Sequence, residues 1–576
     1  MASAAIAQVN ITTWQGDNLH TGANLNETTL TPALVSSPGN FGLLFSQPMD
    51  GQCYSQPLYV SGLTGIAGGT HNVVYLETQH DTIYAFDADN NTGGNASPLW
   101  SKSFLGANEI PVPQSEVGSG DIQVELGNTA TPVIDLASNT IYCLSKVKNT
   151  STSTYIQKLH ALDLKTGAEK FGGPVTINPT FAGSANDGTG GVIPFNPLRS
   201  HARCALTLSN GVVYVLYASH SDTQPYHGEV VGYDKTTLAW LPAKTFIATP
   251  NNGLAGFWAG GASAAVDSAG NMFVATGNGA WDQNSSPFTT GTNWGESFLK
   301  LPATGTFTVS FANTNNWFTP NNWNTLNFGD ADLGSSGVLL LPDQAGPHPH
   351  LLVGGGKGGQ LYVIDRDAMG GLATPNNSVQ EITEVNGLFV TPSYFNGNIY
   401  YAPAGGKFIQ RAVSYNAGTG TYLSTSAVKS NFTYNGGHGA GTFISANGTT
   451  NGIAWILDLG NPAKLHAYNA ANVSGDPIYS GTATLPGNIN VKGPTFGMPI
   501  AANGKVYFAG YNTTTNTGYL TVWGQPAPVA GTPATPTNVA VTPVASTQLT
   551  ITWTDNANNE SGYKIKRSTS LNGTYT

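Results

Sequence analysis

VVYLETQHDTIYAFDAD, at residues 73–89, decides the fold. An alternating apolar run is followed by a polar turn and by a second alternating run that ends in an Asp-containing turn, which is typical of two antiparallel strands. The same pattern recurs in TIYCLSKV with YIQKLHALDLKTG at 140–167 and in GVVYVLYASH with GEVVGYDKTT at 211–237. A strand pair repeated in this way predicts a repeat architecture.

Further copies bring the number of strand pairs to eight. A short strand precedes most pairs, and an outer strand such as PLWSKSF at 98–104 follows several of them. Four alternating strands in each repeat predict a propeller blade, so we expect an all-β chain whose residues 9–524 form an eight-bladed β-propeller. The remaining copies lie at 270–305, 350–370, 397–420, 452–472 and 504–524.

Closure of the ring is predicted from two incomplete blades. The last copy ends at Trp523-Gly524 without an outer strand, whereas FGLLFSQPM at 41–49 is an outer strand without partners. We therefore expect the N-terminal strand to complete the final blade, which would remove an open sheet edge.

Composition narrows the function classes. The 576 residues carry a net charge of −10 with only 9% charged residues, so a nucleic-acid partner is not expected. No run of eighteen apolar residues occurs, so no membrane span is expected. Cys53, Cys143 and Cys204 are widely separated and odd in number, which allows at most one disulfide within the chain and favours buried thiols.

The two ends of the chain differ from the repeats. Residues 1–8 contain Ala5-Ile6-Ala7, similar to a signal-peptide cleavage site, so we interpret them as a signal remnant or a disordered end. The low charge agrees with a secreted or periplasmic, extracellular protein. Residues 525–538 are a Pro-rich linker. Residues 539–576, with Trp553 and Tyr563, resemble a partial fibronectin type III domain, a truncated β-sandwich.

Residues at the starts of the innermost strands should face the propeller axis. Cations, a carboxylate and an aromatic side chain meeting there would suit a planar anionic ligand, or equally a sugar. The residues expected at the axis are Gln56, Arg203, Trp258, Asp330, His438 and Lys492.

The turn Ala161-Leu-Asp-Leu-Lys-Thr-Gly167 resembles that of the quinoprotein alcohol dehydrogenase superfamily, although non-catalytic assembly propellers share it. The resemblance implies eight blades and an enzyme that oxidises an alcohol or a sugar with pyrroloquinoline quinone (PQQ) and a bound metal ion. The family's cofactor-binding lysine would be Lys357, in a Lys-x-Gly-x-x-Tyr-x-x-Asp-Arg run. From their expected place at the axis, Arg203 and Lys492 would add charge pairing to the cofactor and Trp258 would add stacking.

The resemblance also supplies a metal site and a catalytic base. Asn278 in ATGN, Asp332 and Asp222 would ligate Ca²⁺ or a lanthanide, and Asp330 would accept the alcohol proton. Alternatively, Gly277-Asn278-Gly279 is a tight turn and Asp330-Ala331-Asp332 a solvated loop. His220 and His227 flank Asp222 and are candidate ligands for a softer metal.

Three departures from the family pattern stand against this reading. The adjacent cysteines that cover one face of PQQ are absent, Trp258 lies three residues before its expected place, and no Cys-x-x-Cys-His haem motif occurs. Two functions therefore stay open: an exported quinoprotein-like oxidoreductase, or a non-catalytic propeller that binds a glycan or a protein partner at the cell surface. A hydrolase is a weaker third option, because no nucleophile motif is visible.

Overall fold

The computed structural model describes residues 9–281, 291–384, 386–434, 437–527, 533–557, 563 and 565. The chain forms two compact units, one ending at Gly524 and one beginning at Gln525. Residues 1–8 and part of the Pro-rich stretch, 528–532, lie outside the described residues. In the part of the chain that is described, no helix is long and apolar enough to cross a membrane.

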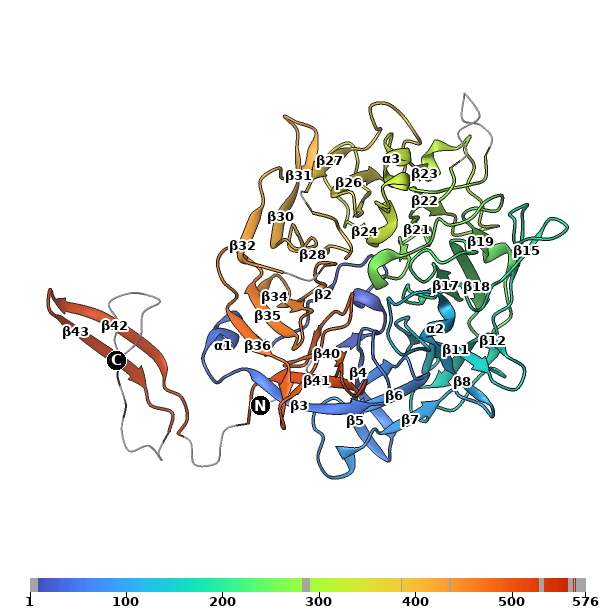
Figure 1. Ribbon diagram of the computed structural model, residues 1–576. Helices are drawn as coiled ribbons and strands as arrows, with labels where there is room; N and C mark the ends of the chain where they lie inside the picture. The colour runs from blue at the N-terminus through green and yellow to red at the C-terminus, as the bar shows by residue number, and fades with distance from the viewer. Residues whose placement is uncertain are drawn as a thin grey trace. The chain divides into compact units, whose positions relative to one another are not determined.

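The first unit is an eight-bladed propeller in which each blade is an antiparallel sheet (Figure 1). All eight predicted strand pairs form the middle two strands of a blade. From the inside outwards, blade 1 consists of β4 (Leu58–Ile66), β5 (Gly69–Glu77), β6 (Thr82–Asp87) and β7 (Trp100–Ser103); blade 2 of β10 (Val133–Asp135), β11 (Thr140–Asn149), β12 (Thr154–Asp163) and β13 (Val175–Thr176); and blade 3 of β16 (Thr207–Ser209), β17 (Val212–Tyr217), β18 (Glu229–Asp234) and β19 (Phe246–Ile247).

In the same order, blade 4 consists of β20 (Ala265–Val266), β21 (Met272–Ala275), β22 (Phe298–Leu301) and β23 (Trp317–Phe318); blade 5 of β24 (Leu339–Leu340), β25 (Leu351–Gly355), β26 (Gln360–Asp365) and β27 (Gln380–Thr383); and blade 6 of β28 (Ser393–Phe395), β29 (Asn398–Tyr401) and β30 (Lys407–Asn416) with β31 (Thr421–Leu423) and β32 (Val428–Thr433). Blade 7 consists of β33 (Thr442–Asn447), β34 (Thr450–Asp458), β35 (Lys464–Asn469) and β36 (Tyr479–Thr482), and blade 8 of β39 (Ile500–Ala502), β40 (Lys505–Tyr511), β41 (Gly518–Gly524) and β3 (Gly42–Met49).

Shorter elements decorate these blades. Blade 2 also carries β8 (Glu109–Pro113) and β9 (Glu125–Leu126), with α2 (Gln114–Val117) between them. Two small hairpins, β14 (Thr180–Ala182) with β15 (Val192–Pro194) and β37 (Thr484–Leu485) with β38 (Ile489–Asn490), lie in connections. The other helices are α1 (Pro32–Ser36) and α3 (Trp323–Phe328), with 3-10 turns η1 (Trp14–Gly16), η2 (Gly93–Ala96), η3 (Pro242–Lys244), η4 (Ala259–Gly261), η5 (Thr314–Asn316) and η6 (Leu333–Ser335).

The N-terminal strand β3 closes blade 8, which confirms the prediction. It pairs antiparallel with β41 from Leu43 opposite Trp523 to Met49 opposite Gly518. Figure 1 shows this blue strand beside the strands from the red end of the propeller. Every blade is thus completed, and the ring has no open edge at its seam.

The segment between Asn10 and Asn24 contacts the inner part of every blade, which the sequence pattern did not predict. It begins as β1 (Asn10–Ile11) on β4 and ends as β2 (Ala23–Asn24), parallel to β33. Between these ends its main-chain carbonyls accept hydrogen bonds from inner strands, for example Thr12 from Ile134 and Asn18 from Val266. The other contacts are Asn18 Nδ2 to Leu208 O, Leu340 N to Leu19 O, Tyr394 N to Thr21 O and Asn24 Nδ2 to Ala501 O.

The repeated Asp-containing turn has a specific structural cause. Asp163 Oδ1 accepts hydrogen bonds from the backbone N–H groups of Lys165 and Thr166, which fixes the turn after β12. Gly167 then adopts a φ of +68°, and a Cβ there would lie 2.7 Å from the Trp100 ring. Only glycine fits this position without strain.

The core consists of apolar layers between neighbouring blades. Tyr75 of blade 1, for example, packs with Ile141 and Leu162 of blade 2, and all three are fully buried. All three cysteines are buried and free, so the allowed disulfide does not form. Burial raises the pKa of the Cys53 and Cys204 thiols to about 12.

In the second unit, the described residues form one two-stranded sheet of β42 (Thr537–Ala545) and β43 (Gln548–Thr554). The Trp553 and Tyr563 rings meet with centroids 4.8 Å apart. A two-stranded sheet is not a sandwich, and most of the residues after Ala557 lie outside the described part of the chain. The fibronectin type III domain therefore stays a prediction.

Candidate functional site

Loops of blades 2 to 8 converge on one cavity of about 370 Å³. Most of the lining residues stand just before an innermost strand or in the turn of a strand pair, where the chain is irregular and polar side chains reach the axis. The cavity is lined by Asp121, Arg203, Ser221, Asp222, Trp258, Asp330, Asp332, Ser335, Lys357, Phe389, His438, Thr495 and Phe496.

A cluster of one lysine, two aspartates and one asparagine occupies one wall of this cavity. Lys357 Nζ lies 2.8 Å from Asp330 Oδ1 and 2.5 Å from Asp332 Oδ2. Asn278 donates from Nδ2 to Asp330 Oδ1 and from its backbone N to Asp332 Oδ1, both at 2.7 Å. Sequence segments from blades 4 and 5 thus meet, as the ring architecture requires.

The backbone before Asn278 allows this close approach. A Cβ on Gly277 would lie 2.1 Å from Asp332 Oδ1, so any side chain there would displace the carboxylate. Asp330 has a φ of +51° and is 68% exposed, whereas Asp332 is 2% exposed. The loop therefore presents one aspartate to the solvent of the cavity and buries the other.

Burial and ion pairing oppose each other at this wall. Burial raises the pKa of Asp332, while Lys357 and the Asn278 N–H group act against the shift. For Lys357, burial acts to lower the pKa, but Asp332 and Asp330 raise it overall. Glu296, which sequence reasoning missed, lies behind the cluster: its Oε2 accepts from Leu333 N at 2.6 Å, and burial raises its pKa well above the usual range.

Three buried polar atoms in and around the cluster lack hydrogen-bond partners. They are Asn278 Oδ1, Trp258 Nε1 and Glu296 Oε1. A buried polar atom without a partner costs about 1–3 kcal/mol, so each is a position where a ligand could supply the missing interaction. An amide carbonyl oxygen suits a hard cation such as Ca²⁺.

Asp222 lies at the same cavity but is held separately. Its Oδ1 accepts a hydrogen bond from Tyr226 Oη at 2.5 Å, and its φ is +56°. In the described residues, three His, Cys, Asp or Glu ligand atoms come within 4.8 Å of one another only at Asp121, His201 and His220. Asp222, Asp330 and Asp332 therefore form no such three-carboxylate group.

Aromatic and cationic side chains line the rest of the cavity. The Arg203 guanidinium lies 4.9 Å from the Phe496 ring centroid, and its Nη1 lies 3.3 Å from Asp121 Oδ2. The His438 ring contacts both Phe389 and Phe496, with centroids 4.9 and 5.4 Å apart, and burial lowers its pKa.

Two residues expected at the axis do not line this cavity. The backbone of Lys492 forms an isolated antiparallel β-bridge with the backbone of Tyr511, and Lys492 Nζ lies 5.7 Å from the Tyr511 ring centroid. Gln56 is engaged by the N-terminal segment, because its Oε1 accepts from Gln15 N at 2.9 Å. Among the described residues that line this cavity, the Lys and Arg side chains are those of Arg203 and Lys357.

No protein-family model and no curated protein matches this chain. Solved structures similar in fold include the quinohemoprotein alcohol dehydrogenase ADHIIG from Pseudomonas putida HK5, at 14% identity and a TM-score of 0.55, covering 92% of this chain and 83% of that one. A europium-containing methanol dehydrogenase is similar at 12% identity and a TM-score of 0.56, covering 89% of this chain and 98% of that one. At these identities the likeness concerns the fold.

Proposed function

We propose that this chain is an exported quinoprotein-type oxidoreductase that oxidises a small alcohol or a carbohydrate with PQQ and a bound metal ion. One observation carries the proposal: Asn278, Asp330, Asp332 and Lys357 meet at the wall of the axial cavity, with Asn278 Oδ1 unpartnered. Support also comes from the fold, since two solved structures similar to the propeller are alcohol and methanol dehydrogenases.

The cavity fits a planar anionic quinone. Its volume of about 370 Å³ lies in the range of small-molecule sites. Arg203 and Lys357 offer cations for carboxylate or quinone oxygens, and Trp258 offers an aromatic face. PQQ, when bound, would supply the two-electron acceptor for the oxidation.

The residues around Asn278 fit a hard cation. Asn278 Oδ1, Asp332 and Asp222 are oxygen ligands of the type that Ca²⁺ and the lanthanides prefer. Among the described residues, Lys357 is the only ion-pair partner of Asp332, so a metal cation would help to neutralise this buried carboxylate. Asp222 would have to exchange its hydrogen bond from Tyr226 for the metal.

Asp330 is the proposed catalytic base. Its carboxylate is exposed to the cavity, and Asn278 Nδ2 and Lys357 Nζ both donate to its Oδ1. These contacts orient the group and leave Oδ2 to accept the proton of a substrate hydroxyl. Asp330 would take the hydroxyl proton, and the carbon-bound hydrogen would leave with two electrons, as a hydride equivalent, for the bound acceptor, so that the alcohol becomes a carbonyl.

The test is PQQ and metal analysis of the purified protein beside Asp330→Ala, followed by dye-linked oxidation of alcohols and sugars with PQQ and Ca²⁺ or La³⁺. We expect both proteins to bind PQQ and only the wild type to oxidise substrate. Equal oxidation by Asp330→Ala would remove Asp330 as the base. Failure of the wild type to bind PQQ at micromolar concentration would contradict the function itself.

A second candidate is a non-catalytic propeller that binds a glycan or a protein partner at the cell surface. The separation of Asp222 from Asp330 and Asp332 favours it, because no three-carboxylate group within 4.8 Å exists among the described residues. A glycan array probed with the wild type and with Trp258→Ala separates the two. Glycan binding lost in Trp258→Ala, with no PQQ bound by the wild type, would favour this candidate.

A further inference from the structure

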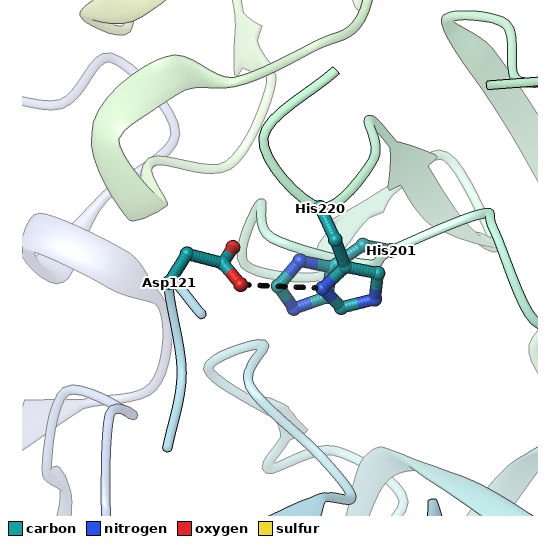
Figure 2. Close-up of side chains that lie close together, drawn as sticks. All are labelled: Asp121, His201 and His220. Atoms are coloured by element: carbon teal, nitrogen blue, oxygen red, sulfur yellow. Dashed lines mark ion pairs between the residues drawn. The ribbon is translucent and has the colours of Figure 1, made fainter. Parts of the chain in front are cut away.

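A second group of candidate ligands lies between blades 2 and 3, beside the axial cavity. Asp121 follows α2 in the loop between β8 and β9, His201 precedes β16, and His220 follows β17. Figure 2 shows the Asp121 carboxylate directed at the two imidazole rings. His220 is 0% and His201 2% exposed, so both rings are removed from solvent.

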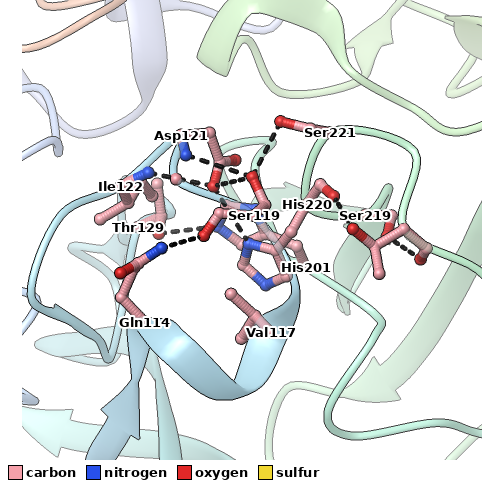
Figure 3. Close-up of polar contacts among 12 residues, drawn as sticks. Gln114, Val117, Ser119, Asp121, Ile122, Thr129, His201, Ser219, His220 and Ser221 are labelled. Carbon is pink, nitrogen blue, oxygen red and sulfur yellow. Dashed lines mark hydrogen bonds and ion pairs between the residues drawn. The ribbon is translucent and has the colours of Figure 1, made fainter.

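Local backbone structure brings the histidines together. His201 and Ala218 exchange both backbone hydrogen bonds, which places His220 beside His201. The rings stack with centroids 4.1 Å apart and planes 14° apart. On the other side, Asp121 Oδ1 is fixed by Ser119 Oγ at 2.9 Å and by Ile122 N at 3.0 Å (Figure 3).

The hydrogen bonds of the rings leave one nitrogen of each unpartnered. His201 Nε2 lies 2.8 Å from Thr129 Oγ1, and His220 Nε2 lies 2.9 Å from Lys146 Nζ. Both Nδ1 atoms are buried and have no hydrogen-bond partner. Thr129 Oγ1 can accept the Nε2–H of His201, the tautomer that leaves a lone pair on Nδ1. Buried imidazole nitrogens that carry lone pairs beside a carboxylate are typical of metal ligands.

We propose that Asp121, His201 and His220 form a mononuclear site for a divalent transition metal ion of the Zn²⁺ class. Their ligand atoms all lie within 4.8 Å of one another, and His220 Nδ1 is 3.8 Å from Asp121 Oδ1. Ligand atoms around tetrahedral zinc are about 3.3 Å apart, so metal binding requires the group to contract and the nearly parallel rings to rotate until both Nδ1 lone pairs point at one ion. Two imidazoles and one carboxylate are a zinc ligand set that keeps a coordination position open.

Outer contacts of the site match this assignment. The Nε2 atoms of both histidines face fixed partners, which is how metal-ligating imidazoles are held in orientation. Arg203 Nη1 contacts Asp121 Oδ2, whereas Oδ1, which accepts from Ser119 Oγ and Ile122 N, lies toward His220 Nδ1 and is the oxygen that would face the metal. Arg203 therefore borders the site as a cation. Ligation at His220 Nδ1 requires the ring proton to be on Nε2, and Lys146 Nζ, which also donates to Leu198 O and Ser200 O, can accept that N–H only as a neutral amine.

This site is separate from the one proposed for PQQ and its metal. It uses imidazole nitrogens, whereas Asn278, Asp332 and Asp222 offer oxygens to a hard cation. Asp121 nevertheless lines the axial cavity, so an ion held by it would lie at the cavity wall. The inference goes beyond the proposed oxidoreductase function and stands whether or not PQQ binds.

The experiment is a titration of the chelator-treated full chain with ZnCl₂, by calorimetry, with Co²⁺ as a spectroscopic probe. The variants are Asp121→Asn and His220→Gln. The matched control is His350→Gln, since His350 is an exposed histidine 2.7 Å from Asp367 and 3.8 Å from Asp343. We expect one tight equivalent per chain, at least tenfold weaker in both site variants and unchanged in the control.

Circular dichroism melting checks that each variant is folded. If a site variant does not fold, X-ray absorption of the zinc-loaded wild type decides, with two imidazoles and one carboxylate expected around the metal. Unchanged affinity in Asp121→Asn and His220→Gln, loss of binding in His350→Gln, or a zinc shell without imidazole would each overturn the proposal. So would a wild type that binds no zinc.

Discussion

Replacing Lys357 by Met tests how the charge of the axial cluster is balanced. The Lys357 ammonium is the charged partner of Asp332, at 2.5 Å, and Asp332 is 2% exposed. Removing one partner of a buried pair costs about 3–5 kcal/mol, because the remaining charge has no compensation. Lys357 is itself 27% exposed, so we expect the lower end, about 3 kcal/mol. The pair with Asp330, which is 68% exposed, adds little.

The assay is urea unfolding of the wild type, Lys357→Met, Asp332→Asn and the double variant. Asp332→Asn removes the charge of Asp332 with little change of shape, because the Oδ1 of an asparagine at this position can still accept the hydrogen bond from Asn278 N. In the double variant no charge is left buried, so most of the loss should be recovered, with a coupling free energy of about 2 kcal/mol. Burial raises the folded pKa of Asp332 and Lys357 opposes that shift, so the pKa should rise further without the lysine, and the destabilisation of Lys357→Met should shrink as the pH falls.

Two results would refute this reasoning. A Lys357→Met variant within about 0.5 kcal/mol of the wild type would mean that Asp332 is solvated or protonated without the lysine. Additive losses in the double variant would mean that the two side chains act independently.

Three further outcomes are expected. Burial lowers the folded pKa of His20 to about 4, below its unfolded value, so at a pH between these two values the unfolded chain binds the proton and the folded protein does not. Acidification from neutral pH to pH 5 should therefore cost about 2 kcal/mol of folding stability through this residue. In urea unfolding, His20→Asn should lose correspondingly less stability on acidification than the wild type. An equal loss in both proteins would contradict the assignment. A thiol reagent should modify none of the three cysteines in the native protein and all three in denaturant; reaction of the native protein would show that a buried thiol is reachable. Gly277→Ala should lose about 1–3 kcal/mol and weaken any PQQ binding, because its Cβ would meet Asp332 Oδ1, whereas Gly94→Ala, with open space around it, should not; a Gly277→Ala variant as stable as Gly94→Ala would mean that the loop shifts freely.

The blades are predictable from the sequence because each strand pair carries its own local pattern. The alternation in 73–89 gives β5 and β6 without knowledge of any distant residue. The missing outer strand of the last repeat likewise indicates β3 as its partner. The N-terminal segment leaves no such signal, because it contacts the blades largely through backbone groups such as Thr12 O and Asn18 O.

The site is predictable only where a motif marks it. Asn278, Asp330 and Lys357 stand in recognisable stretches, and the ring brings them into contact. Phe389 and Phe496 come from irregular loops without periodicity, so sequence reasoning missed both. His220 was a candidate ligand, but its partner His201 is set by the bridge to Ala218, a long-range pairing that the sequence does not encode locally. His227 is not part of the group, since it contacts Thr249 and Asp187 instead.

Equilibrium binding of PQQ, in the presence of Ca²⁺ or La³⁺, tests the role of the axial cavity most directly. The absorption of the bound quinone would be followed for the wild type and for Asn278→Ala. We expect saturable binding of one PQQ per chain that depends on the metal and falls at least tenfold in Asn278→Ala. No binding by the wild type, or binding that ignores both the metal and Asn278, would contradict the proposed site.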